Sequence, residues 1–449
     1  MFENKKVLIL GMARSGVAAA ETLINLHNDV TINDIKKEQD EKIISKLEKM
    51  GCKVVLGSHP DDLLDSSFDY LIKNPGIRDD HKYVVKAREL GVEVINEVEL
   101  AFNLLPKDVT LIGITGTNGK TTTTTITYEI MKEAFGKRVH LAGNIGYPLC
   151  SILNDLKKDD IIVMEVSVQQ SVNIKNFHPH IALMTNYSPA HIDFLGTYEN
   201  YKKTKAKMFY NQSEDDIAIL NLNNSDVLEE MKDIQSNKKY FSSSERANCY
   251  LKDNTIYYND EKVIDCDIVK IPGVHNLENI MGAICIAKEF NVSDAIIKKV
   301  ISNFYGVTHR LEFVDEIKKV RFYNDTEATN IKCTQIALSS FNKPIIIILG
   351  GLERGQNFDD LEKFTKNVKA IIGIGECRER VREFGEKLKI DTYIFEYLKD
   401  TFTKIEEIMQ NGDIVLLSPA SASWDQYPEC EVRGDEFKEL VRRMKNGIN

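Results

Sequence analysis

The residues best suited to chemistry lie in a glycine-rich segment, GITGTNGKT, over residues 113–121. An apolar run (109–112) precedes this segment and a threonine-rich helix start follows it. Glycines let backbone N–H groups approach a polyphosphate, Lys120 supplies a charge for the outer phosphates, and the Thr121 hydroxyl can ligate Mg²⁺. Ile114 stands where the usual pattern has its first glycine. The order strand, loop, helix nevertheless predicts a phosphate-binding loop; the alternative is a glycine-rich turn with an incidental lysine.

Two further candidates follow apolar runs that we expect to be neighbouring strands. Glu165 ends the run 161–164, and His191 follows the run 181–184. Ligands of open α/β sheets bind at the carboxyl ends of the strands, where a carboxylate can hold Mg²⁺. On the residues alone, Glu165 fits a solvated strand end equally well, and a lone histidine is more often structural.

A second nucleotide-like motif opens the chain. GMARSG (11–16) lacks the middle glycine of the G-x-G-x-x-G fingerprint, and Asp34 ends the next strand, where an acidic residue would contact a ribose or a base. The pattern favours a nucleotide portion over NAD. Two nucleotide-like sites with one phosphate loop indicate an ATP-driven enzyme that acts on a nucleotide-bearing substrate.

The elements that must position these residues are short apolar runs alternating with helical stretches, which predicts an α/β fold with mostly parallel sheets. Strands are expected at 7–10, 30–34, 53–56, 70–73, 92–95, 109–112, 161–164, 181–184, 217–220, 320–323, 345–349, 370–374 and 414–417. Hairpins are expected within 249–270, followed by a helix over 275–290. These series predict three domains: 1–98, 99–307 and 308–449.

Composition excludes several classes of protein. The chain has 449 residues, 43% of them hydrophobic, and a net charge of −10, which disfavours nucleic-acid binding. No apolar stretch reaches the roughly 18 residues of a membrane span, and the start lacks a signal-peptide pattern. The eight cysteines include no C-x-x-C pair, so we expect reduced thiols in a cytoplasmic protein. A monomer is expected, because no coiled coil stands out.

Seven motifs in order then resemble one family over the whole chain. They are TGTNGKTTTT (115–124), GNIG (143–146), PGVHNLEN (272–279), THR (308–310), YND (323–325), GGLERG (350–355) and LSPASASWDQY (417–427). The sequence is similar to the Mur ligases, and within that family to the members that add D-glutamate to UDP-N-acetylmuramoyl-L-alanine.

The resemblance implies a Rossmann-like N-terminal domain for the UDP substrate, a central P-loop ATPase domain and a Rossmann-like C-terminal domain for the amino acid. It implies an ATP-dependent acid–amino-acid ligase that uses two Mg²⁺ ions in bacterial peptidoglycan precursor synthesis. Its small-molecule substrates would be UDP-N-acetylmuramoyl-L-alanine, D-glutamate and ATP. ATP would phosphorylate the substrate carboxylate, and the amino group would attack the acyl phosphate.

The resemblance also assigns roles to residues. Catalysis is assigned to Lys120, His191 and Lys205. ATP binding is assigned to Gly116, Thr117, Asn118, Gly119, Lys120, Thr121, Thr122, Asn276, Asn279, Arg310 and Asp325. UDP-substrate binding is assigned to Arg14, Ser15, Asp34, Asn74, Pro75, Gly76, Asn144, Ser167 and Gln170. Amino-acid binding is assigned to Thr329, Arg354 and Ser423, and metal binding to Thr121, Glu165, His191 and Lys205.

Lys205 aligns with a lysine that is carbamylated in the family, a reaction that needs a neutral amine. Its segment, YKKTKAKMF (201–209), is otherwise typical of a solvated basic helix face.

Four residues depart from the family pattern. Val168 and Gln169 replace a serine and a phenylalanine, Glu327 replaces a lysine, and Cys430 replaces a common aromatic residue. The change at Glu327 is two charge units, and unit charges about 4 Å apart interact by about 4 kcal/mol at an effective dielectric near 20. The departures keep two alternatives open: a family paralogue that adds a different amino acid, and a non-catalytic nucleotide-binding relative.

Overall fold

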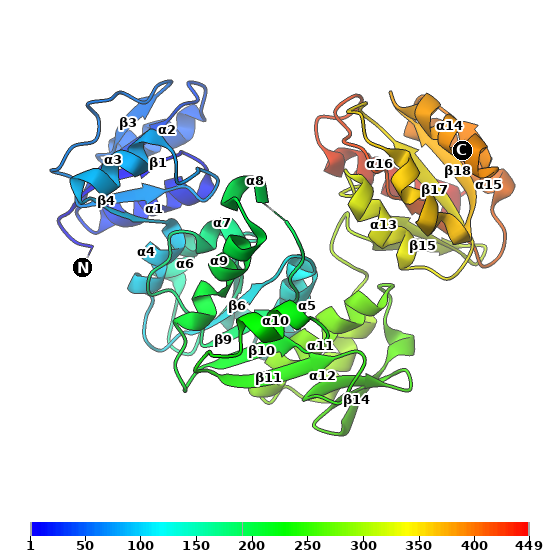
Figure 1. The fold of residues 1–449 in the computed structure, drawn as a ribbon, viewed down its shortest axis with the longest axis horizontal. Coiled ribbons are helices and arrows are strands. Elements are labelled where there is room, and N and C mark those ends of the chain that lie inside the picture. The colour runs from blue at the N-terminus through cyan, green and yellow to red at the C-terminus, as the bar shows by residue number, and fades with distance from the viewer. Residues whose placement is uncertain (1, 191, 448–449) are drawn as a thin grey trace. The chain divides into compact units, whose positions relative to one another are not determined.

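The computed structural model describes residues 2–190 and 192–447, which form an α/β protein with three separate sheets (Figure 1). The chain divides into two compact units: residues up to 264 together with 278–300, and residues 265–277 together with those from 301 onward. The predicted fold class is confirmed, whereas the predicted domain boundaries stay predictions.

The first sheet is parallel throughout and has the strand order β3-β2-β1-β4-β5. Its strands are β1 (Lys6–Leu10), β2 (Asp29–Asp34), β3 (Lys53–Leu56), β4 (Tyr70–Lys73) and β5 (Glu93–Ile95), and its helices are α1 (Arg14–Asn25), α2 (Glu41–Lys49) and α3 (Lys82–Leu90). The chain leaves β1 toward β2 and β3 and later returns to the other side at β4. This reversal is the point at which doubly wound sheets open a ligand crevice.

The second sheet has nine strands in the order β14-β13-β12-β11-β10-β9-β6-β8-β7. They are β6 (Thr110–Thr115), β7 (Val139–Gly143), β8 (Ile161–Glu165), β9 (Ile181–Met184), β10 (Ile217–Asn221), β11 (Asn237–Ser242), β12 (Cys249–Lys252), β13 (Thr255–Tyr258) and β14 (Glu261–Asp265). The strands from β7 to β12 pair in parallel, and β12 and β13 form the predicted antiparallel hairpin. Apolar residues of β6, β8 and β9 are fully or almost fully buried, as expected for parallel strands covered on both faces.

The helices of this region connect these strands. They are α4 (Glu97–Leu104), α5 (Lys120–Phe135), α6 (Leu149–Ile152), α7 (Val168–Ser171), α8 (Ile192–Leu195), α9 (Tyr198–Tyr210), α10 (Ser225–Glu230), α11 (Val274–Glu289) and α12 (Asp294–Ser302). Helix α11 matches the predicted helix over 275–290 closely.

Helix α4 ties the first sheet to the second within one unit. The Glu99 carboxylate accepts hydrogen bonds from the backbone N–H groups of Lys175 (2.9 Å), Asn176 (3.0 Å) and Phe177 (3.0 Å). Glu97 Oε1 accepts from the Cys150 N–H at 2.6 Å, at the start of α6. These carboxylates satisfy backbone donors that burial would otherwise leave unpaired.

The third sheet has the order β15-β16-β20-β17-β18-β19, with β15 antiparallel to β16 and the other pairs parallel. Its elements are β15 (Glu312–Ile317), β16 (Val320–Asn324), α13 (Ile331–Ser339), β17 (Ile345–Gly350), β18 (Val368–Ile374), α14 (Arg378–Leu388), β19 (Asp391–Ile394), α15 (Phe402–Ile408), β20 (Ile414–Leu417) and α16 (Cys430–Lys445).

Every predicted strand is present, with ends that match the predicted ones or differ from them by at most three residues. Strands β7, β11, β15 and β19 lie outside the predicted runs. Three of them, β7, β15 and β19, are edge strands, which bury fewer apolar side chains and therefore give a weaker apolar signal.

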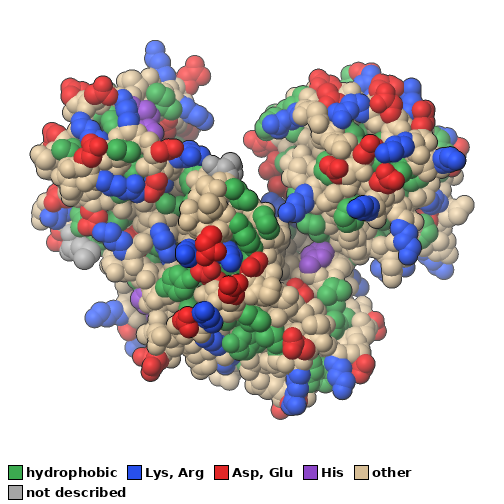
Figure 2. Space-filling model, in the orientation of Figure 1, with side chains coloured by type: hydrophobic (Ala, Val, Ile, Leu, Met, Phe, Trp, Pro, Cys, Tyr) green, Lys and Arg blue, Asp and Glu red, His purple; other side chains and the backbone are tan. Residues whose placement is uncertain are grey.

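The eight cysteines are free. In Figure 2, side chains of both charge signs are interspersed over the visible face rather than gathered into a basic surface. Within residues 2–190 and 192–447, no helix is long and apolar enough to cross a membrane.

Candidate functional site

The glycine-rich segment forms a tight loop between β6 and α5, at the carboxyl edge of the second sheet. Strand β6 lies between β8 and β9, so the loop is flanked by the ends of both neighbours. Gly116 and Gly119 have φ values of +144° and +80°, and an added Cβ would collide with Thr185 at the first position and Asn279 at the second. Only glycine fits this loop, which is the geometry that a phosphate-binding loop requires.

Polar contacts fix the backbone of this loop. Thr117 N donates to Asn186 O (2.8 Å), and the Thr117 hydroxyl lies 2.8 Å from the Tyr201 hydroxyl. Asn118 N donates to Asn186 Oδ1 (3.0 Å), and Lys120 Nζ donates to Thr117 O (2.9 Å). The helix α5 begins at Lys120, and the predicted Thr121 and Thr122 form its first turn. The loop is therefore held in place by neighbouring strand ends rather than left free.

Glu165 ends β8 beside this loop, where Ile114 and Glu165 are register partners. Its side chain is fully buried. Oε1 accepts from Asn144 Nδ2 at 2.7 Å, while the buried Oε2 has no hydrogen-bond partner among the described residues. A buried carboxylate oxygen without a partner is costly unless a cation or donor completes it. This contradicts the solvated strand end that the sequence left open.

Lys205 lies on α9 and is buried, with 1% of its surface exposed. Its Nζ donates to Thr115 Oγ1 (3.1 Å) at the end of β6. Burial, and then the nearby Lys120 charge, hold the pKa of the Lys205 amine well below its usual range, while Glu165 acts in the opposite direction. The interpretation of this segment as a solvated face is therefore wrong at Lys205, although Lys203 on the same helix is exposed.

His191, predicted as a catalytic residue and a metal ligand, lies outside the described residues, so its role stays a prediction.

The residues predicted to hold the adenine nucleotide fall into both units. In the first, Asn279 packs on the phosphate loop, with its Oδ1 3.2 Å from Thr123 Oγ1. In the second, Asn276 Nδ2 donates to Pro272 O (2.6 Å). Asp325 is buried and accepts from Ser418 Oγ (2.7 Å).

The pKa of Asp325 is shifted by its surroundings. Burial raises this pKa to about 7, the Ser418 hydrogen bond and Arg310 act in the opposite direction, and Glu327 adds to the rise.

The motif GMARSG and Asp34 border a cavity of about 610 Å³ at the carboxyl edge of the first sheet. The cavity lies where the strand order reverses between β1 and β4. It is lined by Gly11, Ala13, Asp34, Ile35, Lys36, His59, Asn74, Gly76, Ile77, Arg78, Asp80 and His81. Each oxygen of the Asp34 carboxylate accepts a backbone N–H, from Met12 (2.7 Å) and Lys36 (2.8 Å). Asn74 Nδ2 is buried and has no hydrogen-bond partner within residues 2–190 and 192–447, as expected for a group that meets a ligand.

The remaining predicted UDP-substrate residues have other neighbours. Arg14 donates from its guanidinium to Gly146 O, in the GNIG segment, while Ser15 lies next along α1 and Pro75 between the cavity residues Asn74 and Gly76. Ser167 and Gln170 form a capping box at the start of α7. Their side chains therefore shape the loop after Glu165, and a direct contact with substrate stays a prediction.

The predicted amino-acid residues lie in the second unit. Ser423 is buried, and its Oγ has no hydrogen-bond partner among the described residues. The exposed Arg354 guanidinium stacks over Trp424, the residue after Ser423, with 5.6 Å to the ring centroid. Thr329 is exposed after β16. Ser423 and Arg354 are thus brought close through Trp424.

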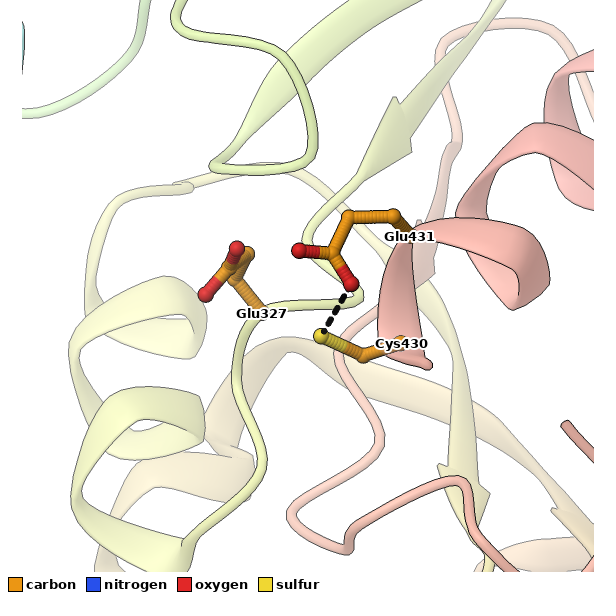
Figure 3. Close-up of side chains that lie close together, drawn as sticks. All are labelled: Glu327, Cys430 and Glu431. Atoms are coloured by element: carbon orange, nitrogen blue, oxygen red, sulfur yellow. Dashed lines mark hydrogen bonds between the residues drawn. The ribbon is translucent and has the colours of Figure 1, made fainter. Parts of the chain in front are cut away.

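Two of the family departures meet in the second unit (Figure 3). Glu327 comes from the segment after β16, while Cys430 and Glu431 begin α16; one ligand-type atom from each lies within 4.8 Å of the others. Cys430 Sγ donates to Glu431 Oε2 (3.3 Å), and burial raises the pKa of this thiol to about 11. The cysteine is therefore protonated at neutral pH. Glu327 also pairs with Arg310, with 3.3 Å between Oε2 and Nη2.

Three residues at these sites escaped the sequence reasoning. Tyr201 contacts the phosphate loop from α9, and His59 and His81 line the cavity in the first sheet. A signal existed for His59, which follows the predicted strand 53–56 by three residues. The other two lie within or beside helices, so only the fold brings them to the sites.

A phosphate loop at one sheet edge, a nucleotide-sized crevice at another and a third α/β sheet define a multidomain P-loop nucleotide-binding protein. A family model described as the Mur ligase middle domain matches residues 114–287, and one described as the Mur ligase MurD-like N-terminal domain matches residues 5–96. The chain belongs to the Mur ligase family.

Curated relatives extend over the full chain. UDP-N-acetylmuramoylalanine–D-glutamate ligase of Streptococcus uberis is 43% identical over 449 residues, which is 100% of this chain and 98% of the relative. The Enterococcus hirae protein of the same name is 42% identical over 98% of this chain and 97% of the relative.

Solved structures share the fold. UDP-N-acetylmuramate-alanine ligase of Thermotoga maritima aligns with a TM-score of 0.56 and 18% identity, over 99% of this chain and 100% of that one. MurF ligase of the same organism, in complex with ADP, aligns with a TM-score of 0.58 and 18% identity, over 92% and 96% of the two chains.

Proposed function

We propose that this chain is an ATP-dependent ligase that joins D-glutamate to UDP-N-acetylmuramoyl-L-alanine. The observation that carries the proposal is the trio of Glu165, Lys205 and the phosphate loop at one sheet edge, in a chain 43% identical over its full length to a ligase of that name. The reaction belongs to cytoplasmic peptidoglycan precursor synthesis, and the working form is a monomer.

The chemistry begins with the substrate carboxylate, which is a poor electrophile. Its oxygen attacks the γ-phosphorus of ATP, and the bond from that phosphorus to the β-phosphate oxygen breaks. ADP departs, and the substrate carboxylate has become an acyl phosphate. Lys120 and the N–H groups at the start of α5 stabilise the negative charge that builds on the phosphoryl oxygens. The amine of D-glutamate then attacks the acyl carbon, and the tetrahedral intermediate collapses to an amide and inorganic phosphate.

The residues present fit magnesium. The buried, unpartnered Glu165 Oε2 is a hard oxygen ligand, and Thr121 stands at the position that ligates Mg²⁺ in phosphate loops. We propose two ions, held by Thr121, Glu165, His191 and Lys205. When bound, Mg²⁺ neutralises charge on the phosphates.

Lys205 becomes a metal ligand only as a carbamate. Its neutral amine adds to the carbon of CO₂, an N–C bond forms, and one proton leaves to solvent. Burial favours the neutral amine that this reaction needs.

The remaining binding roles are divided among the three sheets. We propose that the cavity of the first sheet binds the UDP portion and that Asn144 orients the substrate beside Glu165. The unpartnered Ser423 hydroxyl, with Thr329 and Arg354, binds the carboxylates of the amino acid. We keep the predicted boundaries near residues 98 and 308 for this division.

A second candidate, motivated by Glu327 and Cys430, is a ligase of the same family that adds a different amino acid. The test is phosphate release from ATP in the presence of UDP-N-acetylmuramoyl-L-alanine, with D-Glu, L-Glu, D-Asp or no amino acid. Release that depends on D-Glu supports the proposal. Release with another amino acid supports the second candidate. If no amino acid causes phosphate release while ATP still binds, the protein is a non-catalytic nucleotide binder, and both ligase candidates are overturned.

A further inference from the structure

A buried lysine ends strand β4 of the first sheet. Lys73 is the last residue of this strand and stands directly before Asn74, which lines the cavity of that sheet. Only 1% of Lys73 is exposed, and its side chain is fully covered. A lysine is almost never fully buried unless a partner compensates for the lost hydration of its ammonium group. The contacts of Lys73 therefore indicate what this side chain does.

Lys73 is bonded to the segment that follows β4. Its Nζ donates to Ile77 O at 2.5 Å and lies 3.5 Å from Asp79 Oδ1. The other carboxylate oxygen, Asp79 Oδ2, accepts a hydrogen bond from the Arg88 guanidinium on α3. The lysine thus joins the end of a strand to the loop that leads from this strand to α3.

The charges of Lys73 and Asp79 support each other. Burial, and less strongly the Arg88 charge, lower the pKa of Lys73, whereas Asp79 acts in the opposite direction. Burial acts to raise the pKa of Asp79, but the hydrogen bonds and the positive charges of Arg88 and Lys73 together hold it below its usual value. An ammonium group also binds a carbonyl oxygen more strongly than a neutral donor does.

The loop that Lys73 holds, residues 74–81, forms much of the wall of the cavity of about 610 Å³. It supplies six lining residues: Asn74, Gly76, Ile77, Arg78, Asp80 and His81. Gly11 of the GMARSG motif lies against this loop, because an added Cβ at Gly11 would come within 2.8 Å of Asn74 Cβ and 3.3 Å of Ile77 Cδ1. A small displacement of the 74–81 loop therefore changes the shape of the cavity that the loop and Gly11 line together.

Lys73 acts at the point where the 74–81 loop turns. The Ile77 N–H donates to Asn74 O at 3.0 Å and closes the first turn, while Lys73 binds the carbonyl group of the same residue. The next residue, Arg78, lies over the Phe194 ring of α8, with 5.9 Å from the guanidinium carbon to the ring centroid. The loop is thus fixed by a buried contact at Ile77 and by a more exposed contact at Arg78.

We propose that Lys73, paired with Asp79, is a positioning residue that holds the 74–81 loop in the shape that admits the nucleotide substrate. It acts through Ile77 and Asp79 rather than on the substrate itself. The inference rests on the proposed function, because it names a residue that sets the affinity for the UDP substrate. The alternative is that Lys73 only stabilises the first sheet.

Lys73→Met tests the proposal in the full chain. Methionine keeps an unbranched side chain in the buried space, and Asp79 retains Arg88, so no buried charge is left unpaired. We expect the Kd for UDP-N-acetylmuramoyl-L-alanine, measured by calorimetric titration, to rise by about tenfold, the effect of one lost charge-assisted hydrogen bond. The Kd for a non-hydrolysable ATP analogue should stay unchanged.

Lys46→Met is the matched control. Lys46 lies on α2 of the same sheet, has a side chain that is 57% exposed and pairs with Glu21 at 2.5 Å. This variant also loses an ion pair, but one that lies outside the cavity lining. It should bind both ligands as the unaltered protein does.

Asp79→Asn reaches the same pair from its more exposed side, since the Asp79 side chain is 38% exposed. Asparagine can still accept from Arg88 but removes the negative charge that supports Lys73. The Kd for the UDP substrate should rise in the same direction by a smaller factor. The double variant should bind no more weakly than Lys73→Met, because both changes act on one contact. This variant decides the question if Lys73→Met fails to fold.

Two results overturn this inference alone. One is an unchanged Kd for the UDP substrate in the folded variants. The other is an equal rise in the Kd values for the UDP substrate and the ATP analogue, together with a lower melting temperature, which identifies a residue that only stabilises the fold. If the unaltered protein does not bind UDP-N-acetylmuramoyl-L-alanine at all, the proposed function fails as well.

Discussion

Arg310 Nη2 lies 3.3 Å from Glu327 Oε2, so the cation predicted to hold the adenine nucleotide is paired with the residue that departs most in charge from the family pattern. Both side chains are partly exposed, at 54% for Arg310 and 29% for Glu327, so the pair itself adds little stability. Its consequence is electrostatic: an anionic nucleotide that approaches Arg310 also meets the Glu327 carboxylate.

Replacing Glu327 by lysine should therefore raise the rate of ATP-dependent phosphate release. Removing the anion and adding a cation stabilises the charge of the phosphoryl transition state, and a gain of about 1.4 kcal/mol gives about tenfold. The measurement is kcat with saturating substrates. Glu431→Lys makes the same charge change in the neighbouring side chain and should have the smaller effect. Equal rates for the two variants would contradict the hypothesis that the charge of Glu327 slows the reaction.

Replacing Lys205 by methionine should remove activity without removing the fold. Burial lowers the pKa of this amine and so disfavours its charged form, and methionine fills similar space without a polar atom that needs solvation. We expect phosphate release to fall by at least about a hundredfold, with an unfolding free energy unchanged or higher.

Lys203→Met, on the exposed side of the same helix, is the control and should retain the rate of the unaltered protein. An active Lys205→Met protein would refute the assignment. A loss of activity in step with a loss of stability would point to packing instead.

Sequence alone predicts the parallel strands and the phosphate loop because both depend on local patterns. The apolar runs are long enough to mark β6, β8 and β9, and the glycines of the loop are required by backbone geometry at Gly116 and Gly119. Glu165 could be placed at a strand end, but its burial could not, because burial depends on what the neighbouring loops cover.

Other parts of the sites depend on contacts between distant segments. The local pattern around Lys205 is basic and favours a solvated face, yet tertiary packing buries this lysine against Thr115, 90 residues away. The contact between His59 Nδ1 and Asn33 Oδ1 likewise joins residues that are 26 positions apart. No local pattern carries such information.

Ser423 should be needed for amino-acid binding but not for stability. Its buried hydroxyl has no hydrogen-bond partner in the described part of the chain, so Ser423→Ala removes an unsatisfied polar atom and should leave the melting temperature unchanged or slightly higher. The KM for the amino acid should rise by about tenfold, the effect of one lost hydrogen bond.

The neighbouring Ser421 provides the contrast. Its Oγ accepts from Gln356 Nε2 at 2.6 Å, so Ser421→Ala should lower the melting temperature. Thermal unfolding and steady-state kinetics separate the two effects. An unchanged KM in Ser423→Ala would remove this hydroxyl from the amino-acid site.

Glu97 should make stability fall as the pH rises. Burial raises its pKa from 4.5 to about 7 in the folded protein, so the folded state binds this proton more tightly than the unfolded chain does. The resulting stabilisation is fully present below pH 4.5 and is lost as the pH rises through about 7. A shift of this size corresponds to about 3 kcal/mol.

Glu97→Gln keeps an oxygen for the Cys150 N–H but cannot ionise. Relative to this variant, the unaltered protein should lose about 3 kcal/mol of unfolding free energy between about pH 5 and about pH 8, measured by urea denaturation. Glu89→Gln, at an exposed glutamate of α3, should follow the unaltered protein across the range. Parallel pH profiles for Glu97→Gln and the unaltered protein would contradict this prediction. They would mean that the Glu97 carboxyl, at the contact between α4 and α6, ionises in the folded state as it does in the unfolded chain.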